Sequence, residues 1–169
     1  VAALVAGTVL FVGIRLAVLR FAEISTVIVL RHAEKLDASD DTPLSTEGRA
    51  RAQRLADMFG RATDTGAVRA IYASDTRRTR DTAAPLAARL ALSVVTLPGE
   101  DVDGLLGRLR RDGRGQTSLV VGHSNTVPQI VAELTGGRFE VTVAPDDHGS
   151  VFVVTISSFG PPSVLRLRY

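Results

Sequence analysis

The sequence predicts an α/β fold, a three-layer α/β/α sandwich in which helices cover both faces of a mostly parallel central sheet. Short apolar runs rich in β-branched residues alternate with segments of helical periodicity through the middle of the chain. Two of these runs, residues 27–30 and 119–121, are apolar at every position, as in strands buried on both faces. Helical crossovers between such strands leave them parallel to each other.

The composition is that of one compact domain with a substantial core. The chain has 169 residues, of which 45% are hydrophobic and 22% are charged. The absence of cysteine excludes disulfides and thiolate chemistry. Lys35 is the only lysine, so arginine supplies nearly all of the positive charge, yet the net charge is only +2. No aromatic residues interleave with a basic patch, so nucleic acid is not a predicted partner.

The first 22 residues differ in character from the predicted domain, residues 23–169. Residues 1–14 carry no charge, and a second apolar stretch follows Arg15. A membrane-spanning helix needs about 20 mostly apolar residues, so we expect residues 1–20 to act as a membrane anchor or a signal-like segment. An amphipathic helix lying on the domain is the alternative. The predicted location is therefore membrane-anchored or exported, with the side of the membrane open and a cytoplasmic location as the alternative.

The first helix is predicted after a strand at residues 27–30 and a polar loop. It covers residues 47–59, with Ser45 as its N-cap and Thr46 as the alternative cap. Its spacing predicts four core contacts, namely Ala50, Leu55, Met58 and Phe59.

The remaining elements alternate between strands and helices. In order, we expect strand 68–73, helix 76–90, strand 92–97, helix 101–111, strand 119–121, helix 125–134 and strands 151–156 and 164–167. Pro85 predicts a kink or a local break in its helix. Residues 164–167 alternate apolar side chains with arginine, which is typical of an edge strand.

Two of the three histidines stand at the carboxyl ends of predicted strands. His32 follows Arg31 after residues 27–30, and His123 follows residues 119–121. In open α/β sheets this edge is where ligands bind, so we expect the two histidines to meet there. Arg78 lies in the first turn of a helix that follows a strand, which directs it to the same edge, where free amides favour anions.

These residue types suit the chemistry of a phosphoryl group. Arg31 and Arg78 can each hold phosphate oxygens in bidentate fashion, and His123, if protonated, adds a third donor. His32 is the candidate nucleophile because a neutral imidazole can attack phosphorus, and nearby arginines keep it neutral by lowering its pKa. Phosphoryl transfer needs mainly positioning and charge stabilisation, so neither a metal nor a cofactor is expected.

Four short motifs occur in a fixed order along the chain. They are R-H-A-E at residues 31–34, L-S-x-x-G at 44–48, S-x-x-x-R-T-x-x-T-A at 74–83 and G-H-S at 122–124. Together they resemble the signature of the histidine phosphatase (phosphoglycerate-mutase-like) superfamily, in its small phosphatase branch. The resemblance implies a phosphoglycerate-mutase-like fold and an enzyme of the histidine acid phosphatase type, a phosphoric monoester hydrolase.

The resemblance also implies roles for individual residues. A phosphomonoester or phosphoramidate would phosphorylate His32, and water would then hydrolyse the phosphohistidine. Arg31, Arg78 and His123 would bind the phosphate of a phosphorylated small molecule or phosphoprotein. Members of the superfamily commonly supply an acid between the arginine helix and the second histidine.

Three acidic residues stand in the position of that acid. They are Glu100, Asp101 and Asp103, and we take Glu100 as the candidate because it lies in the predicted loop. No surrounding motif selects among the three.

Several alternatives to a phosphatase stay open. The chain lacks long insertions that would cover the site, which favours hydrolysis over phosphoglycerate-mutase-type phosphotransfer. A catalytically weak phosphate-binding module is a further alternative. A remote one is a serine esterase that uses Ser124 with Asp146, Asp147 and His148. His148 otherwise belongs to a surface turn or lines the pocket. No motif specifies the substrate or the oligomeric state.

Overall fold

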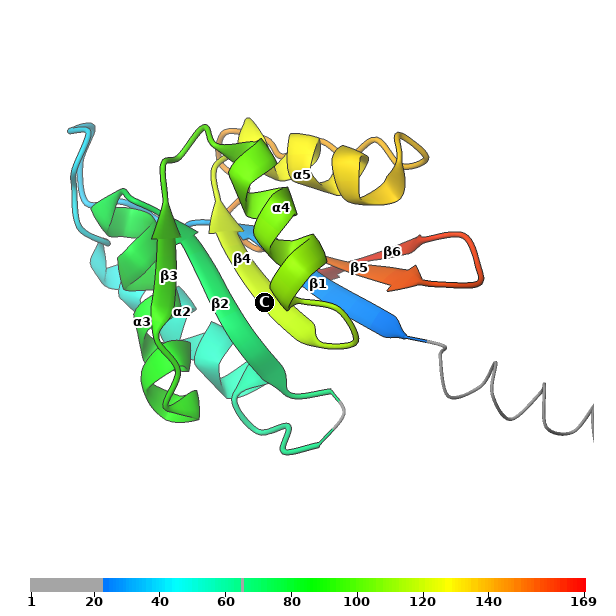
Figure 1. Cartoon of the computed structure of the whole chain (residues 1–169). Helices are drawn as coiled ribbons and strands as arrows, with labels where there is room; N and C mark the ends of the chain where they lie inside the picture. The colour runs from blue at the N-terminus through cyan, green and yellow to red at the C-terminus, as the bar shows by residue number, and fades with distance from the viewer. Residues whose placement is uncertain (1–22, 65) are drawn as a thin grey trace, which may run out of the picture.

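A six-stranded sheet forms the centre of the computed structural model, which describes residues 23–64 and 66–169. Its strands are β1 (Ile24–Arg31), β2 (Val68–Ser74), β3 (Val94–Leu97), β4 (Thr117–Gly122), β5 (Ser150–Ser157) and β6 (Ser163–Arg168). They lie in the order β3-β2-β4-β1-β5-β6, and the first four are mutually parallel. β5 runs antiparallel to both of its neighbours (Figure 1). The prediction of a mostly parallel sheet with an arginine-bearing edge strand is confirmed.

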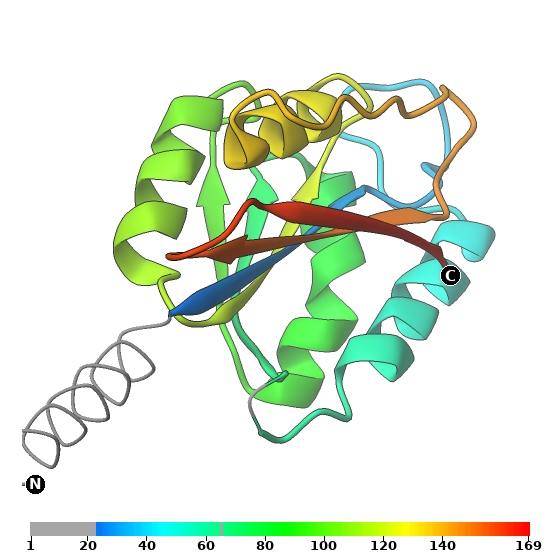
Figure 2. The same ribbon diagram turned by 90° about the vertical axis from the view of Figure 1, so that its right-hand side faces the viewer.

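Two pairs of helices cover the two faces of the sheet (Figure 2). They are α2 (Thr46–Phe59) with α3 (Arg77–Leu90), and α4 (Val102–Asp112) with α5 (Thr126–Thr135). Each pair encloses its own apolar core against the sheet. The three-layer α/β/α sandwich is therefore confirmed.

The expectations for residues 1–22, a membrane anchor or signal-like segment, lie outside the described residues. Within residues 23–64 and 66–169, no helix combines the length and the apolar character needed to cross a membrane.

Strand β1 occupies a central position and contributes to both cores. Ile28 and Leu30 face α2 and α3, whereas Val27 and Val29 face α4 and α5. All four side chains are at most 3% exposed. Burial on both faces explains the uninterrupted apolar run. Because β1 is central in the sheet, the residue that follows it lies near the middle of the carboxyl edge.

Helix α2 buries a different stripe from the one its spacing predicts. Leu55 is fully buried as expected, but Ala50 is exposed and Met58 is 43% exposed. The buried positions beside Leu55 are Ala52 and Ala56. Phe59 packs against the core that Leu55 and Ala56 share with α3, as predicted. Ala52 packs instead with Ala33 and Leu44.

Helix α3 continues through Pro85 without a break, so of the two predicted outcomes, a kink or a local break, the local break is wrong. Proline removes the amide that would bond the carbonyl of Asp81. Asp81 is partly exposed, so water can satisfy that carbonyl. Burial of Ala83 and Leu86 on the core side holds the helix together across this point.

The start of α2 is fixed to the loop that follows β1. Ser45 caps the helix as predicted, its Oγ accepting a hydrogen bond from the amide of Gly48 at 3.0 Å. The amide of Ser45 in turn donates to the carbonyl of Glu34 at 2.9 Å. A Cβ atom at Gly48 would overlap that same carbonyl oxygen, so only glycine permits this contact.

We expect Gly48→Ala to destabilise the protein by about 1–3 kcal/mol, because the new methyl group must displace backbone atoms of Glu34. Thermal unfolding of the purified variant measures the effect. Gly107→Ala is the matched control, since a Cβ there meets nothing within 4 Å inside α4. Alanine in a helix interior should raise stability by up to about 1 kcal/mol. Equal unfolding midpoints for the two variants would contradict this packing argument.

Candidate active site

The two predicted histidines meet at the carboxyl edge of the sheet. β1 and β4 are parallel neighbours with Arg31 opposite Gly122, so the residue after each strand reaches the same level. The amide of His32 continues this pairing by donating to the carbonyl of Gly122 at 2.9 Å. The rings of His32 and His123 then lie with their centroids 5.4 Å apart, at an interplanar angle of 66°.

One open pocket of about 430 Å³ collects every residue predicted for the site. It contains Arg31, His32, Arg78, Glu100 and His123. Six further residues complete its lining, namely Lys35, Thr76, Gly99, Ser124, Asn125 and Thr126. The pocket lies at the carboxyl edge of the parallel strands, where the arrowheads of β2, β3 and β4 point in Figure 1.

His32 is held as a neutral ring with a defined tautomer. Its Nδ1 lies 2.8 Å from the carbonyl oxygen of Ala33. A carbonyl can only accept, so Nδ1 carries the proton and Nε2 keeps its lone pair. Burial, reinforced by His123 and Arg31, lowers the pKa of His32 to about 3, although the bond to Ala33 opposes the shift. At neutral pH the ring therefore offers Nε2 as a nucleophile.

The loop that carries His32 is anchored from α3. Thr82 accepts a hydrogen bond from the amide of Ala33 at 2.9 Å and donates to the carbonyl of Arg78 at 2.7 Å. Glu34 forms an ion pair with Arg51, whose Nε lies 2.7 Å from its nearer carboxylate oxygen. These contacts set the position of the peptide that fixes the His32 tautomer.

His123 is neutral as well in the ligand-free protein. Burial, together with the charges of Arg78 and Arg31, lowers the pKa of His123 to about 4. Its Nε2 lies 2.8 Å from Ser74 Oγ. The sequence-based picture of a protonated His123 as a third donor therefore does not describe the free site, because burial and two guanidinium groups oppose its protonation.

The two arginines are partly satisfied by backbone carbonyls and partly free. Arg31 Nη1 donates to Ala144 and Pro145 at 3.1 and 2.6 Å, and Arg78 Nη1 donates to Asp40. The Nε atoms of both arginines are buried without a hydrogen-bond partner in the described part of the chain. A buried unpaired donor is costly, and an oxyanion held between the two guanidinium groups would satisfy both.

A third histidine, which the sequence did not place, supports the site from behind. His148 Nδ1 lies 2.8 Å from the carbonyl of His32, and the two rings are 5.5 Å apart. Since that carbonyl accepts, Nδ1 of His148 is the donor. The two residues are 116 positions apart, and no local pattern links them. The reading of His148 as a mere surface turn is wrong.

The serine esterase triad does not form. His148 is engaged by His32, while Asp147 accepts from Ser150 at 2.6 Å and pairs with Arg166 at 2.8 Å. Among the described residues, no hydrogen bond joins His148 to Asp147 or Ser124. An acid, a base and a nucleophile in contact are what this alternative requires.

Two neutral histidines, the buried His32 and the half-buried His123, make the free energy of unfolding fall as the solution is acidified. The unfolded chain protonates both near pH 6.5, whereas folded His32 and His123 stay neutral down to about pH 3 and 4. The unfolded state therefore binds more protons in this window. We expect each histidine to lower the free energy of unfolding by about 2 kcal/mol as the pH falls from 7 to 5. Denaturant titrations at both pH values should show a smaller loss in the His32→Asn/His123→Asn double variant.

These features define a class of protein, an α/β domain with an oxyanion pocket of paired histidines and arginines at the carboxyl edge of its sheet. Residues 27–99 match the family model of the histidine phosphatase superfamily (branch 1). The structure is similar to that of the protein histidine phosphatase SixA complexed with tungstate, with a TM-score of 0.67 and 25% identity over 85% of this chain and 96% of that chain. The family-model match and the likeness to SixA both support the predicted resemblance to the histidine phosphatase superfamily, in its small phosphatase branch.

Other solved structures share the fold at lower identity. The alpha-ribazole phosphatase of Shigella flexneri has a TM-score of 0.65 and 18% identity, covering 85% of this chain and 96% of its own. A mycobacterial glucosyl-3-phosphoglycerate phosphatase has a TM-score of 0.60 and 16% identity, covering 78% and 90%. Comparison with curated proteins gives no significant match. The family-model match and the SixA likeness support a phosphatase.

Proposed function

We propose that the chain is a metal-independent phosphatase that hydrolyses a phosphomonoester or phosphoramidate through a phosphohistidine on His32. One observation carries the proposal. His32 presents an unprotonated Nε2 in the pocket where Arg31 and Arg78 each bury an unpartnered Nε. A neutral nucleophile beside two unsatisfied guanidinium donors suits attack on a phosphoryl group.

The reaction has two steps. Nε2 of His32 attacks phosphorus in line, forming a P–N bond as the bond from phosphorus to the leaving oxygen or nitrogen breaks. The Nδ1–H bond to Ala33 stabilises the positive charge that develops on the ring. Arg31 and Arg78 stabilise the charge on the phosphoryl oxygens. Water then attacks phosphorus, the P–N bond breaks, and phosphate leaves with His32 restored.

Glu100 is the proposed proton donor to the leaving group. It lies between β3 and α4 and lines the pocket, exposed to solvent. Asp101 is occupied as the N-cap of α4, accepting from the amide of Gly104 at 2.9 Å, and Asp103 lies within that helix. A proton donor that is exposed to solvent suits an open pocket, because water there can exchange protons with it.

The open pocket supports bulky substrates, including a phosphorylated side chain of another protein. Phosphohistidine is a phosphoramidate, and SixA is described as a protein histidine phosphatase. We therefore place protein phosphohistidine beside small phosphomonoesters as substrate classes. No described segment closes the pocket, so water can reach the intermediate. Hydrolysis is therefore favoured over mutase-type transfer.

A substrate screen with a covalent trap tests this function. The protein is incubated with phosphoramidate, p-nitrophenyl phosphate, sugar phosphates, nucleotides and phosphoproteins, with His32→Ala as the blank. We expect turnover above the blank and, after rapid quenching, an acid-labile and base-stable phosphate on the protein. A label that survives acid would exclude phosphohistidine. A label that passes to a second substrate in preference to water would indicate a mutase. The absence of both label and turnover would indicate an inert module.

A further inference from the structure

Ser74, the last residue of β2, contacts His123 directly. Its Oγ lies 2.8 Å from His123 Nε2, and the side chain is 7% exposed. The predicted strand, residues 68–73, ends one residue before Ser74. The parallel pairing of β2 with β4 explains the contact, because it brings the end of one strand beside the end of the other.

Two threonines hold the Ser74 hydroxyl from the other side. Thr79 Oγ1 lies 2.9 Å from Ser74 Oγ and 3.0 Å from Thr76 Oγ1. It also lies 2.9 and 2.8 Å from the carbonyl oxygens of Ser74 and Thr76. Those carbonyls only accept, so the single Thr79 proton goes to one of them and the Thr79 oxygen becomes an acceptor. When Thr76 donates to the Thr79 oxygen, the Ser74 proton is available for His123.

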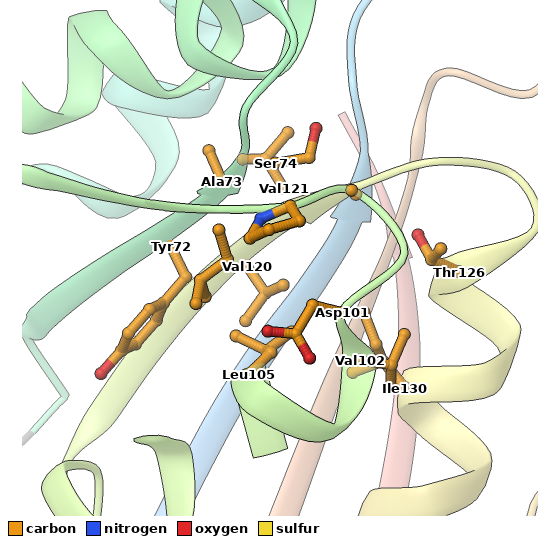
Figure 3. A pocket seen from close by; sticks show the side chains of 14 residues that line it. Tyr72, Ala73, Ser74, Asp101, Val102, Leu105, Val120, Val121, Thr126 and Ile130 are labelled. Carbon is orange, nitrogen blue, oxygen red and sulfur yellow. The ribbon is translucent and has the colours of Figure 1, made fainter. Parts of the chain in front are cut away.

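The space beneath Ser74 does not offer a competing partner. A cavity of about 30 Å³ lies under the loop between β3 and α4, with Ser74 at one end. Figure 3 shows its walls, which are largely apolar and include Tyr72, Leu105 and Ile130. A water molecule needs several polar partners to be held in such a space. The Ser74 hydroxyl has three side-chain partners in the protein, Thr76, Thr79 and His123.

We propose that Ser74 is a positioning residue that donates its hydroxyl proton to His123 Nε2 and thereby places the ring proton on Nδ1, the nitrogen left to bind a phosphoryl oxygen. The inference rests on the proposed function and on the role that the family resemblance implies for His123, which is to bind the phosphate. The proposal explains how a neutral His123 can donate a hydrogen bond to the phosphate. The hydrogen bond that one ring nitrogen makes decides which of the two nitrogens carries the proton. Without Ser74 the ring would be free to carry its proton on Nε2.

The tautomer can be measured without any activity. The chain has three histidines, so proton–nitrogen correlation spectra of the side chains are simple, and His123→Ala identifies the His123 signals. At neutral pH we expect His123 to be protonated at Nδ1 in the native protein. In Ser74→Ala we expect a shift toward the Nε2-protonated form. A native ring protonated at Nε2, or a tautomer unchanged by Ser74→Ala, would overturn the proposal.

Kinetics with matched variants give the second test. We expect Ser74→Ala to lower kcat by about tenfold, as for other partners that orient a histidine, with KM little changed. Ser74→Thr, which retains the hydroxyl, should restore most of the rate. Ser118→Ala removes a buried hydroxyl on β4 that has no hydrogen-bond partner among the described residues, and its His123 tautomer should stay native. If both alanine variants lost the same amount of rate and showed the same change of the His123 tautomer, the specific role of Ser74 would be overturned. If the native chain hydrolyses no substrate, the proposed function fails while the spectra still decide the tautomer.

Discussion

Replacing His32 by asparagine should lower kcat by about 10⁴-fold or more, because the variant loses the nucleophile on which the covalent step depends. Asparagine is the informative replacement, since its amide can still donate to the carbonyl of Ala33 as Nδ1 does at 2.8 Å. The fold should persist, since the native ring is neutral and asparagine introduces no buried charge. Steady-state hydrolysis and the acid-labile label measure the two losses together.

The phosphohistidine assignment can fail in a clear way. Thermal unfolding of His32→Asn shows whether the variant is folded, so a lost rate is not confused with a lost structure. Turnover that survives in folded His32→Asn but disappears in Ser124→Ala would contradict the assignment and restore serine chemistry. Turnover that survives both would place the reaction outside this pocket.

Replacing Arg78 by alanine should lower kcat/KM by about 10²–10³-fold, the usual effect of removing one donor to the transition state. The buried Nε of Arg78 has no partner among the described protein groups, so its loss removes binding capacity for the phosphoryl oxygens. Binding of inorganic phosphate or tungstate, followed by calorimetry, should weaken in parallel with the rate. Replacing Arg31 should have an effect of the same size.

The neighbouring residue on α3 provides the matched control. Arg77 is exposed and pairs with Asp81 at 3.6 Å, and it does not line the phosphate pocket. Arg77→Ala removes the same charge from the same helical turn, so a general electrostatic effect would appear in both variants. We expect a rate close to that of the native protein. Losses of equal size in the two variants would refute a direct contact between Arg78 and phosphate.

Features that depend on neighbouring residues could be predicted from the sequence. The apolar run before Arg31 and the similar run before His123 specify buried strands whose ends reach a common edge. The crossover rule then makes the strands parallel, so the meeting of His32 and His123 follows from local pattern and topology together. Helix α3 begins directly after β2, which places Arg78 at that same edge.

Features that depend on distant backbone atoms could not be predicted. Arg31 is held by the carbonyls of Ala144 and Pro145, and backbone carbonyls are the same for every residue type. His148 reaches His32 through a loop with no regular structure, so neither periodicity nor spacing indicates its position. The buried face of α2 includes Ala52, which packs with Ala33 and Leu44, and a single-helix pattern does not contain these partners.

Strand β1 determines from which side the protein can be attached to a support. It runs for eight residues from Ile24 to Arg31, a span of about 26 Å at the usual rise per residue. Its first residue, Ile24, lies at the edge of the sheet opposite the pocket. Immobilisation through that side, on a bead or a sensor chip, would leave the pocket facing the bulk solution. A phosphorylated protein could then approach it without meeting the support.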